Sequence, residues 1–286
     1  MESSKQTIVS RRVLINIFLL GLMGIIFYFG QTVAERKAIK GQLTSLQPSA
    51  ISNIKITRKG MNDIVLKKLN DHWQLTSPIK ISANRFNTSQ ILQLATAKSG
   101  SSFAALEESL HKYGLDKPET TVQLDDISIA FGNSNPIGYR RYVLIKNTVH
   151  LIRDRHIHWL RGDSDSFISL KLLPINAKIK RIQFPEILIS KNSEGQWQSS
   201  DSTLFKSMDE IQALLSAWQN TEALQVVSAP LTEDAQTIII ELQSNEIINL
   251  AFIKTATGAN ISNQKTGIQY QFTNSQITDF FPPSGA

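Results

Sequence analysis

The residues whose types could bind a metal are few, and the pair with the most suggestive spacing is His156 and His158, which form the tripeptide His-Ile-His. On a strand, side chains two residues apart point to the same face, which is the spacing of half a zinc site. A closed zinc site needs three or four ligands, and His150 and Asp154 are only near in sequence. We expect these histidines to lie at the surface or to cap hairpins, and we predict no metal site and no cofactor.

Carboxylates that work as an acid–base pair must converge in space from different environments. The acidic pairs of this chain are instead direct sequence neighbours, whose side chains diverge: 107–108, 125–126 and 209–210. The chain has no cysteine, which excludes thiolate zinc sites and cysteine nucleophiles. It also lacks the G-x-S-x-G, P-loop, H-E-x-x-H and G-x-G-x-x-G motifs. We therefore predict no catalytic residue and a protein that is not an enzyme.

The elements that would position any site occur twice along the chain. In the first copy, short apolar strands lead to the polar turn at 70–71 and then to Trp73. In the second copy, similar strands lead to the turn at 194–195 and then to Trp197. Asn, Asp and Gly tolerate the positive φ of tight hairpins, and a tryptophan after the turn can close the hairpin onto a core. A repeat of this length indicates a duplicated domain.

Each copy also contains one amphipathic helix. Apolar residues recur at i, i+3, i+4 and i+7 over 88–95 and again over 211–218, which makes one stripe that can pack on a sheet. Strand-like runs follow each helix, at 121–124, 127–131, 141–145 and 149–152 and then at 237–242, 247–253 and 267–272. Several strands beside one helix per copy indicate the α+β class with mainly antiparallel sheets.

We divide the body of the chain accordingly. A first α+β module is predicted over 49–163, and a second α+β module over 177–281. The connection at 164–176 contains several apolar residues, and we expect a short helix there that ends at Pro174 because proline cannot continue a helix.

The N-terminal part of the chain contains an uncharged, strongly apolar stretch at 13–34. A helix of this length spans about 33 Å, enough for a bilayer core of about 30 Å. We predict a single-pass transmembrane helix, preceded by a cytoplasmic tail at 1–12 and followed by a stalk at 35–48. Cleavage after Ala34 is the alternative, but the apolar run exceeds the roughly 7–15 residues of a signal-peptide core. Equal numbers of basic residues flank the run, so orientation rests on the simpler topology, with the large domain outside.

The chain is basic, with a formal charge of +6 and a pI near 9.4. Its basic residues come as scattered pairs, such as those at 58–59 and 140–141, and not as a long run interleaved with aromatic residues. Nucleic-acid binding is therefore not expected. We expect the pairs to lie on solvated faces, with attraction to anionic lipid headgroups as the alternative.

A hexapeptide in the first copy resembles a known family. It reads Tyr-Gly-Leu-Asp-Lys-Pro and contains Tyr113, Gly114, Leu115, Asp116 and Pro118. Together with Trp73 before it and with Gly132 and Tyr142 after it, it is similar to the bacterial domain-of-unknown-function family 4340. The physical interpretation is structural: Gly114 permits a positive φ and Pro118 fixes the entry into the strand near Thr121. The segment 132–136 is expected to be a turn.

The resemblance implies a single-pass protein of the bacterial inner membrane with its bulk in the periplasm, and some relatives occur beside gliding-motility-type ABC-transporter components. We expect a non-catalytic accessory or scaffold protein of a cell-envelope complex, with an envelope protein as its partner and the lipid bilayer held through 13–34. The alternative is a binding module that holds a lipid, glycan or peptide in a cleft between the two modules.

Overall fold

A computed structural model describes Met23 and residues 41–230 and 234–282. The cytoplasmic tail predicted at 1–12 lies outside the described residues, as does the predicted transmembrane segment at 13–34 apart from Met23. Among the residues that the structure describes, none of the helices is long and apolar enough to span a bilayer.

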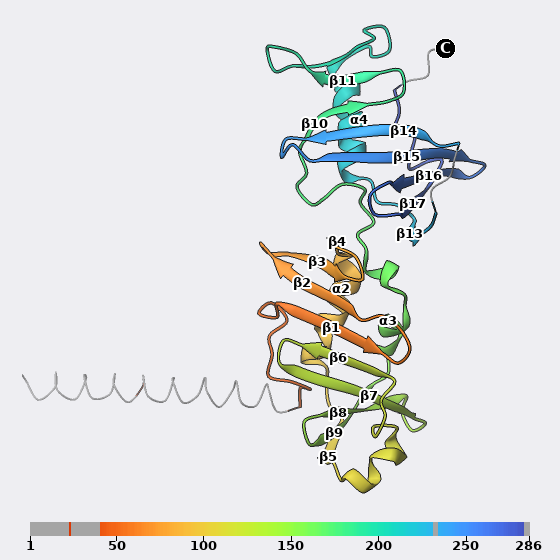
Figure 1. Cartoon of the computed structure of the whole chain (residues 1–286). Helices are drawn as coiled ribbons and strands as arrows, with labels where there is room; N and C mark the ends of the chain where they lie inside the picture. Colours follow the sequence, from red (N-terminus) through yellow and green to blue (C-terminus); the bar gives the residue numbers. More distant parts are fainter. Residues whose placement is uncertain (1–22, 24–40, 231–233, 283–286) are drawn as a thin grey trace, which may run out of the picture.

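The first part of the chain folds into a nine-stranded sheet (Figure 1). The order across the sheet is β4-β3-β2-β1-β6-β7-β8-β9-β5, and its paired neighbours are antiparallel. Its strands are β1 (Asn53–Arg58), β2 (Ile64–Leu69), β3 (His72–Ser77), β4 (Ile81–Ser82), β5 (Ser101–Ala104), β6 (Thr120–Leu124), β7 (Ile127–Asn135), β8 (Arg140–Ile145) and β9 (Thr148–Arg153). Its helices are α2 (Arg85–Leu92), η1 (Gln93–Thr96), η2 (Glu107–Tyr113), α3 (Ile157–Arg161) and η3 (Ser164–Phe167).

The second part folds into an eight-stranded antiparallel sheet with the order β12-β11-β10-β14-β15-β16-β17-β13. Its elements are β10 (Ile179–Gln183), β11 (Leu188–Lys191), β12 (Trp197–Ser199), α4 (Met208–Asn220), β13 (Gln225–Ser228), β14 (Gln236–Leu242), β15 (Ile247–Thr255), β16 (Gly258–Asn263) and β17 (Ile268–Thr273). Two mainly antiparallel sheets with few helices confirm the predicted α+β character, with strands predominating.

The two sheets have the same strand order once the two-residue β4 is left out. In each sheet the first three strands form a meander that ends at an edge, and the strand that follows the helix lies at the opposite end, as β5 or β13. Trp73 and Trp197 therefore occupy corresponding strands, β3 and β12. The repeat that the sequence indicates is thus present in the topology.

Alternation of apolar and polar residues explains why these segments are strands. Along β1 every second residue is buried, as expected for a strand with one face on the core. The β2–β3 turn uses Asn70 and Asp71 at φ values of 47° and 62°, the left-handed geometry that a two-residue hairpin requires. The corresponding turn before β12 uses Gly195 at φ 80°.

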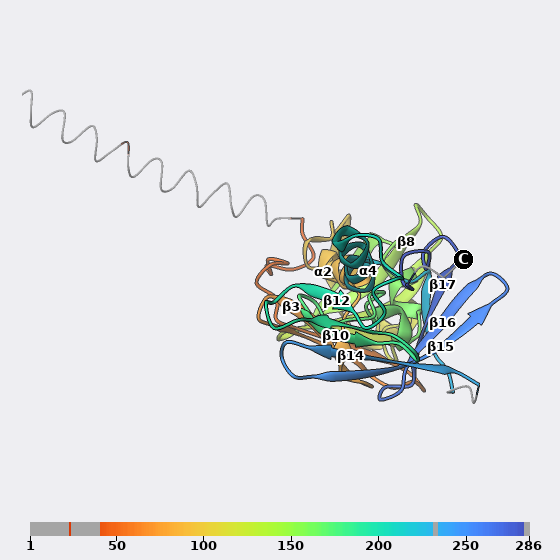
Figure 2. The same cartoon turned by 90° about the horizontal axis from the view of Figure 1, so that it is seen from above.

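The helices present their apolar stripe to the sheets. In α4 the predicted residues Ile211, Leu214, Leu215 and Trp218 are all buried. The Ser207 hydroxyl caps the helix by accepting from the amide of Glu210, which satisfies one of the free N–H groups of the first turn. Seen from above, α2 and α4 lie on the same side of the molecule (Figure 2). One continuous hydrophobic core joins both parts of the chain.

Several elements differ from the sequence prediction. The connection at 164–176 contains only the 3₁₀ turn η3 and no longer helix, because its backbone bonds to Ser82 of β4, to Asn84 and to Ala223 near the start of β13. The segment 132–136 is not a turn: β7 continues to Asn135. Within the predicted stalk, Leu43 and Thr44 are buried and their amides donate to the carbonyls of Ala97 and Ala95, so this portion packs on η1 and the residue after it.

Candidate functional site

A groove of about 1900 Å³ lies where the two sheets meet. Its walls come from the β2–β3 turn and α2 of the first part, from the connection, and from the end of α4 and β13 of the second part. Trp73, which the sequence singled out, lines it, whereas Trp197 does not. The Trp197 ring lies under Lys191 Nζ, at 5.4 Å from the ring centroid.

Backbone hydrogen bonds of the connection fix the floor of this groove. The amide of Asn84 donates to the carbonyl of Phe167 at 2.7 Å, and the amide of Ser169 donates to Ser82 at 2.8 Å. At the next residue of the connection, the carbonyl of Leu170 accepts from the amide of Ala223 at 2.8 Å. The connection therefore pairs first with the end of β4, at the edge of the first sheet, and then with Ala223, two residues before β13 at the edge of the second sheet.

Side chains add further contacts across the junction. The Asp165 carboxylate accepts from the Ser228 amide at 2.6 Å and from its hydroxyl at 3.0 Å. Asn176 Nδ2 lies 3.3 Å from His72 Nε2. A carboxylate that accepts two hydrogen bonds holds its partner more firmly than a neutral acceptor, so the end of β13 is tied to η3.

The lining of the groove mixes exposed apolar groups with amides. Phe86 and Leu224 are 59% and 65% exposed, and the edge of the Trp159 ring packs against Phe86 at a centroid distance of 5.4 Å. Six amide side chains join them in the lining, from Asn84, Asn87, Asn176, Gln219, Asn220 and Gln225. Charged residues of both signs are present. This chemistry suits a neutral polar chain with apolar side groups better than a small ion.

The hexapeptide of the resemblance covers the other face of the first sheet. Gly114 ends η2 at φ 67°, as predicted, and Pro118 stands just before β6. Tyr113 packs on Tyr142 at a centroid distance of 4.7 Å. Leu115 is buried together with Val149 and Leu151, outside the main core cluster, while Asp116 is exposed. The motif thus packs against the sheet at Tyr142.

Gly132 is where this covering segment touches the sheet. A Cβ at position 132 would lie 2.2 Å from the carbonyl oxygen of Tyr113 and 2.8 Å from Cγ of Leu115. Real carbon–oxygen contacts are never that short, so only glycine fits. The motif residues Tyr113, Leu115 and Gly132 therefore form one packing contact, and their role is structural.

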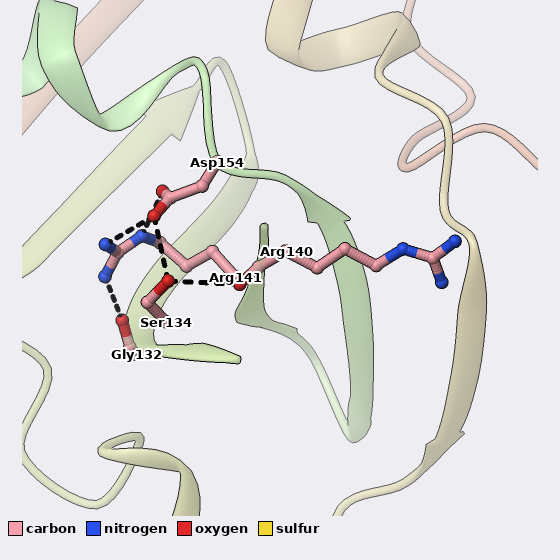
Figure 3. Close-up of polar contacts among 5 residues, drawn as sticks. All are labelled: Gly132, Ser134, Arg140, Arg141 and Asp154. Carbon is pink, nitrogen blue, oxygen red and sulfur yellow. Dashed lines mark hydrogen bonds and ion pairs between the residues drawn. The ribbon is translucent and has the colours of Figure 1, made fainter. Parts of the chain in front are cut away.

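Arg141 braces the same strand from its other side (Figure 3). Its Nε and Nη2 donate to the two oxygens of Asp154 at 2.5 and 2.9 Å, and Nη1 donates to the carbonyl of Gly132 at 2.5 Å. Both side chains are largely buried, at 12% and 21% exposure. Bidentate pairing of this kind is strong and directional, so Arg141 is not the solvated residue that its sequence context indicated.

Arg58 is a second basic residue that was predicted to lie on a solvated face and does not. It is 7% exposed and donates through Nη1 to the carbonyl of Gly162, at the end of α3. Burial lowers its pKa, while the nearby Asp163 carboxylate opposes that shift. Since β1 buries every second side chain, Arg58 falls on the core face. This alternation along β1 was the sequence signal that could have predicted its burial.

The histidines do not converge. His156 precedes α3 and is buried, whereas His158 lies in that helix and its ring packs against Trp159 at 5.2 Å. The strand spacing on which a two-histidine half-site depends is absent, because α3 occupies the segment. The expectation that these histidines lie at the surface or cap hairpins is wrong for His156, which is buried. His150 Nδ1 lies 3.1 Å from the Ser99 hydroxyl. Among the described residues, no three His, Asp or Glu side chains are grouped as a metal site.

Burial, helped by the Arg155 cation, lowers the pKa of His156 to about 4, against a partly opposing backbone contact with Gln90. The neutral ring is therefore the form that the fold accepts. Histidine in the unfolded chain has a pKa near 6.5, so above that pH the ring is neutral in both states and stability is at its full value. As the pH falls toward the lower folded pKa, the unfolded state binds the proton first, and the free energy of unfolding decreases.

Replacing Gly132 with alanine is expected to lower the free energy of unfolding by about 3 kcal/mol, the upper end of overpacking costs, because backbone atoms oppose the new Cβ. Chemical denaturation of the full chain in mild detergent measures this. Ser128→Ala on the same strand is the matched control, since Ser128 is exposed. A Gly132→Ala chain as stable as the control would contradict the packing contact.

Lowering the pH from 7 to 4.5 is expected to remove about 2–3 kcal/mol of unfolding free energy through His156 alone. Carboxylates titrate in the same range, so the informative quantity is the difference between the parent chain and His156→Gln. The variant should lose less stability between the two pH values, while His111→Gln, at an exposed position, should behave like the parent. Equal pH dependence in all three chains would refute the role of His156.

Comparison with known proteins gives one match. The sequence profile of the family described as "Domain of unknown function (DUF4340)" matches residues 73–238, from β3 through the junction to β14. No curated protein and no solved structure matches. The match covers more than half of the chain and includes Trp73, the hexapeptide, Gly132, Tyr142 and the whole hairpin that contains Trp197. The chain therefore belongs to this domain-of-unknown-function family, DUF4340.

Proposed function

We propose that this protein is a non-catalytic accessory protein of the bacterial cell envelope, anchored in the inner membrane by residues 13–34 with its two sheets in the periplasm. Its junction groove holds an extended segment of an envelope partner. Association with an ABC transporter is one form that this role takes. The observation that carries the proposal is the groove between the sheets, whose floor is fixed by the hydrogen-bonded connection.

The size of the groove favours an extended occupant. Pockets for small molecules have volumes of about 300–1,000 Å³, whereas this groove measures about 1900 Å³. It runs over parts of α2, the connection and β13. A polymer segment fills such a space, and a single metabolite would leave most of its walls wet.

The edge of the second sheet supplies the means of recognition. β13 is the terminal strand of its sheet and pairs with β17, and Gln225, Val226 and Val227 line the groove. The connection flanks this edge at both ends, at Ala223 and at Ser228, so an added strand would pair with the stretch between them. Main-chain hydrogen bonds there would give affinity, and side-chain pockets would give selectivity. Asp165 holds the end of β13 at Ser228, so the edge is ordered before a partner arrives.

Lack of catalysis is supported by where the perturbed groups lie. Shifted pKa values gather at active sites, but the groups with clear shifts, such as His156 and Tyr270, are not among the groove residues.

A glycan is the second candidate occupant. The aromatic rings of Trp73 and Phe86 and the six amides in the lining are groups that stack on sugar rings and hydrogen-bond their hydroxyls. The peptide is favoured over the glycan because β13 offers main-chain pairing that a sugar cannot use.

The test is photo-crosslinking in intact cells, with a photoreactive residue in place of Leu224 in the full chain. We expect a covalent adduct with one envelope protein, mapped to one extended segment, and we expect Phe86→Asp to abolish it. Ile247, 57% exposed at the start of β15 and outside the groove, is the matched control position.

Adducts of equal yield and identity at positions 224 and 247, or an adduct unaffected by Phe86→Asp, would contradict binding in the groove. An adduct that a glycan-degrading enzyme removes and a protease does not would replace the peptide with the glycan. Absence of any adduct at position 224 would contradict both occupants.

A further inference from the structure

The β7–β8 hairpin carries an exposed apolar tip at residues 136–139. Ile137 and Tyr139 are 81% and 88% exposed, the two highest values among the exposed large apolar side chains of the described residues. The tip is held in shape by Asn135, whose Oδ1 accepts from the Ile137 amide at 2.8 Å and whose Nδ2 donates to the Tyr142 hydroxyl at 2.9 Å. Large apolar side chains held out in water in this way mark an interaction surface.

Contacts link this tip to the place where the described body of the chain begins. The Ser99 amide donates to the carbonyl of Gly41 at 2.8 Å. Next along the chain, a Cβ at Gly100 would lie 2.6 Å from Nη1 of Arg140, the residue that follows Tyr139. Arg140 and Arg141 project in opposite directions, and Arg140 extends across the sheet toward β5 (Figure 3). The tip and Gly41 therefore lie at the same end of β8, β9 and β5.

Six residues, 35–40, lie between Ala34, the last residue of the predicted transmembrane segment, and Gly41, so seven Cα–Cα steps join the two. Even a fully extended chain of that length reaches only about 25 Å. The end of the first sheet that carries the hairpin tip is therefore held close to the membrane, if the anchoring of the proposed function holds.

Uncompensated positive charge surrounds the tip. Arg140 pairs directly with Arg153 across β8 and β9, and Arg155 follows two residues later. None of the ion pairs of the described residues includes these three side chains. The nearby carboxylate, Asp154, is already engaged by Arg141. Like charges that face each other on neighbouring strands repel. This end of the sheet therefore carries positive charge that the ion pairs of the described residues do not balance.

We propose that residues 136–139 insert into the headgroup region of an anionic bilayer, with Ile137 and Tyr139 among the upper acyl chains and Arg140, Arg153 and Arg155 on the lipid phosphates. Arginine beside aromatic and aliphatic side chains is the composition of interfacial anchors. The contact fixes the orientation of the first sheet on the membrane and leaves the junction groove facing the periplasm. The inference rests on the membrane anchor of the proposed function and not on the occupant of the groove.

The absence of native cysteine allows a clean test. Full-length Ile137→Cys, labelled with a polarity-sensitive fluorophore, is reconstituted into vesicles of phosphatidylglycerol and phosphatidylethanolamine. We expect blue-shifted emission and weaker quenching by aqueous iodide than for the same label at Ile247→Cys. The shift should shrink in phosphatidylcholine vesicles and with Arg153→Glu, whereas Lys254→Glu, an exposed charge reversal in the second sheet, should leave it unchanged.

Flotation of the same vesicles reports the anchor separately. A chain that floats while the label at 137 behaves like the label at 247 overturns the tip contact and leaves the anchor standing. A chain that fails to float overturns both. A shift that is equal in neutral vesicles and indifferent to Arg153→Glu overturns the assignment to anionic headgroups.

Discussion

The structure depends on the backbone pairing of the connection with both sheets. A chain of two duplicated sheets joined by a free linker would have two independent cores and no fixed surface between them. Here Phe167, Ile168, Leu172 and Leu173 are buried in one core that continues from the first sheet into the second. The hydrogen bonds from Asn84, Ser169 and Ala223 satisfy backbone groups that burial would otherwise leave without partners. The connection thus fixes how the two sheets are placed against each other, and this placement forms the groove.

Duplication has left the two sheets with one topology and different surfaces. Only the first sheet carries η2 and the hexapeptide, between β5 and β6; the corresponding strands β13 and β14 are separated by residues 229–235 alone. The insertion buries Leu115, and its Tyr113 packs on Phe103 of the matching edge strand β5 at a centroid distance of 5.3 Å. β13 has no such addition and lines the groove instead. The same ancestral edge thus serves stability in one sheet and an open surface in the other.

The strands with regular alternation, the hairpin turns and both helical stripes could be predicted from the sequence, because each depends on local chemistry. β16 could not: it begins Gly-Ala-Asn, a composition that resembles a loop, yet a Cβ at Gly258 would meet the Phe272 carbonyl at 1.8 Å. Glycine is there because β17 lies so close. The burial of Arg58 and Arg141 was missed for a related reason, since their partners Gly162 and Asp154 lie elsewhere in the sequence, Asp154 directly after β9. Trp73 was singled out as the residue that closes a hairpin, and nothing local indicates that it lines a groove whose other walls include residues 219–227.

The backbone pairing of the connection with both parts of the chain is most directly tested by hydrogen exchange of backbone amides in the full chain. If the two sheets form one body, the amides of Asn84, Ser169 and Ala223 exchange as slowly as those of the central strands β1 and β10, because all open together. If these three amides exchange at the rate of exposed loops while β1 and β10 stay protected, the sheets move independently, and the account of a fixed groove between them is wrong.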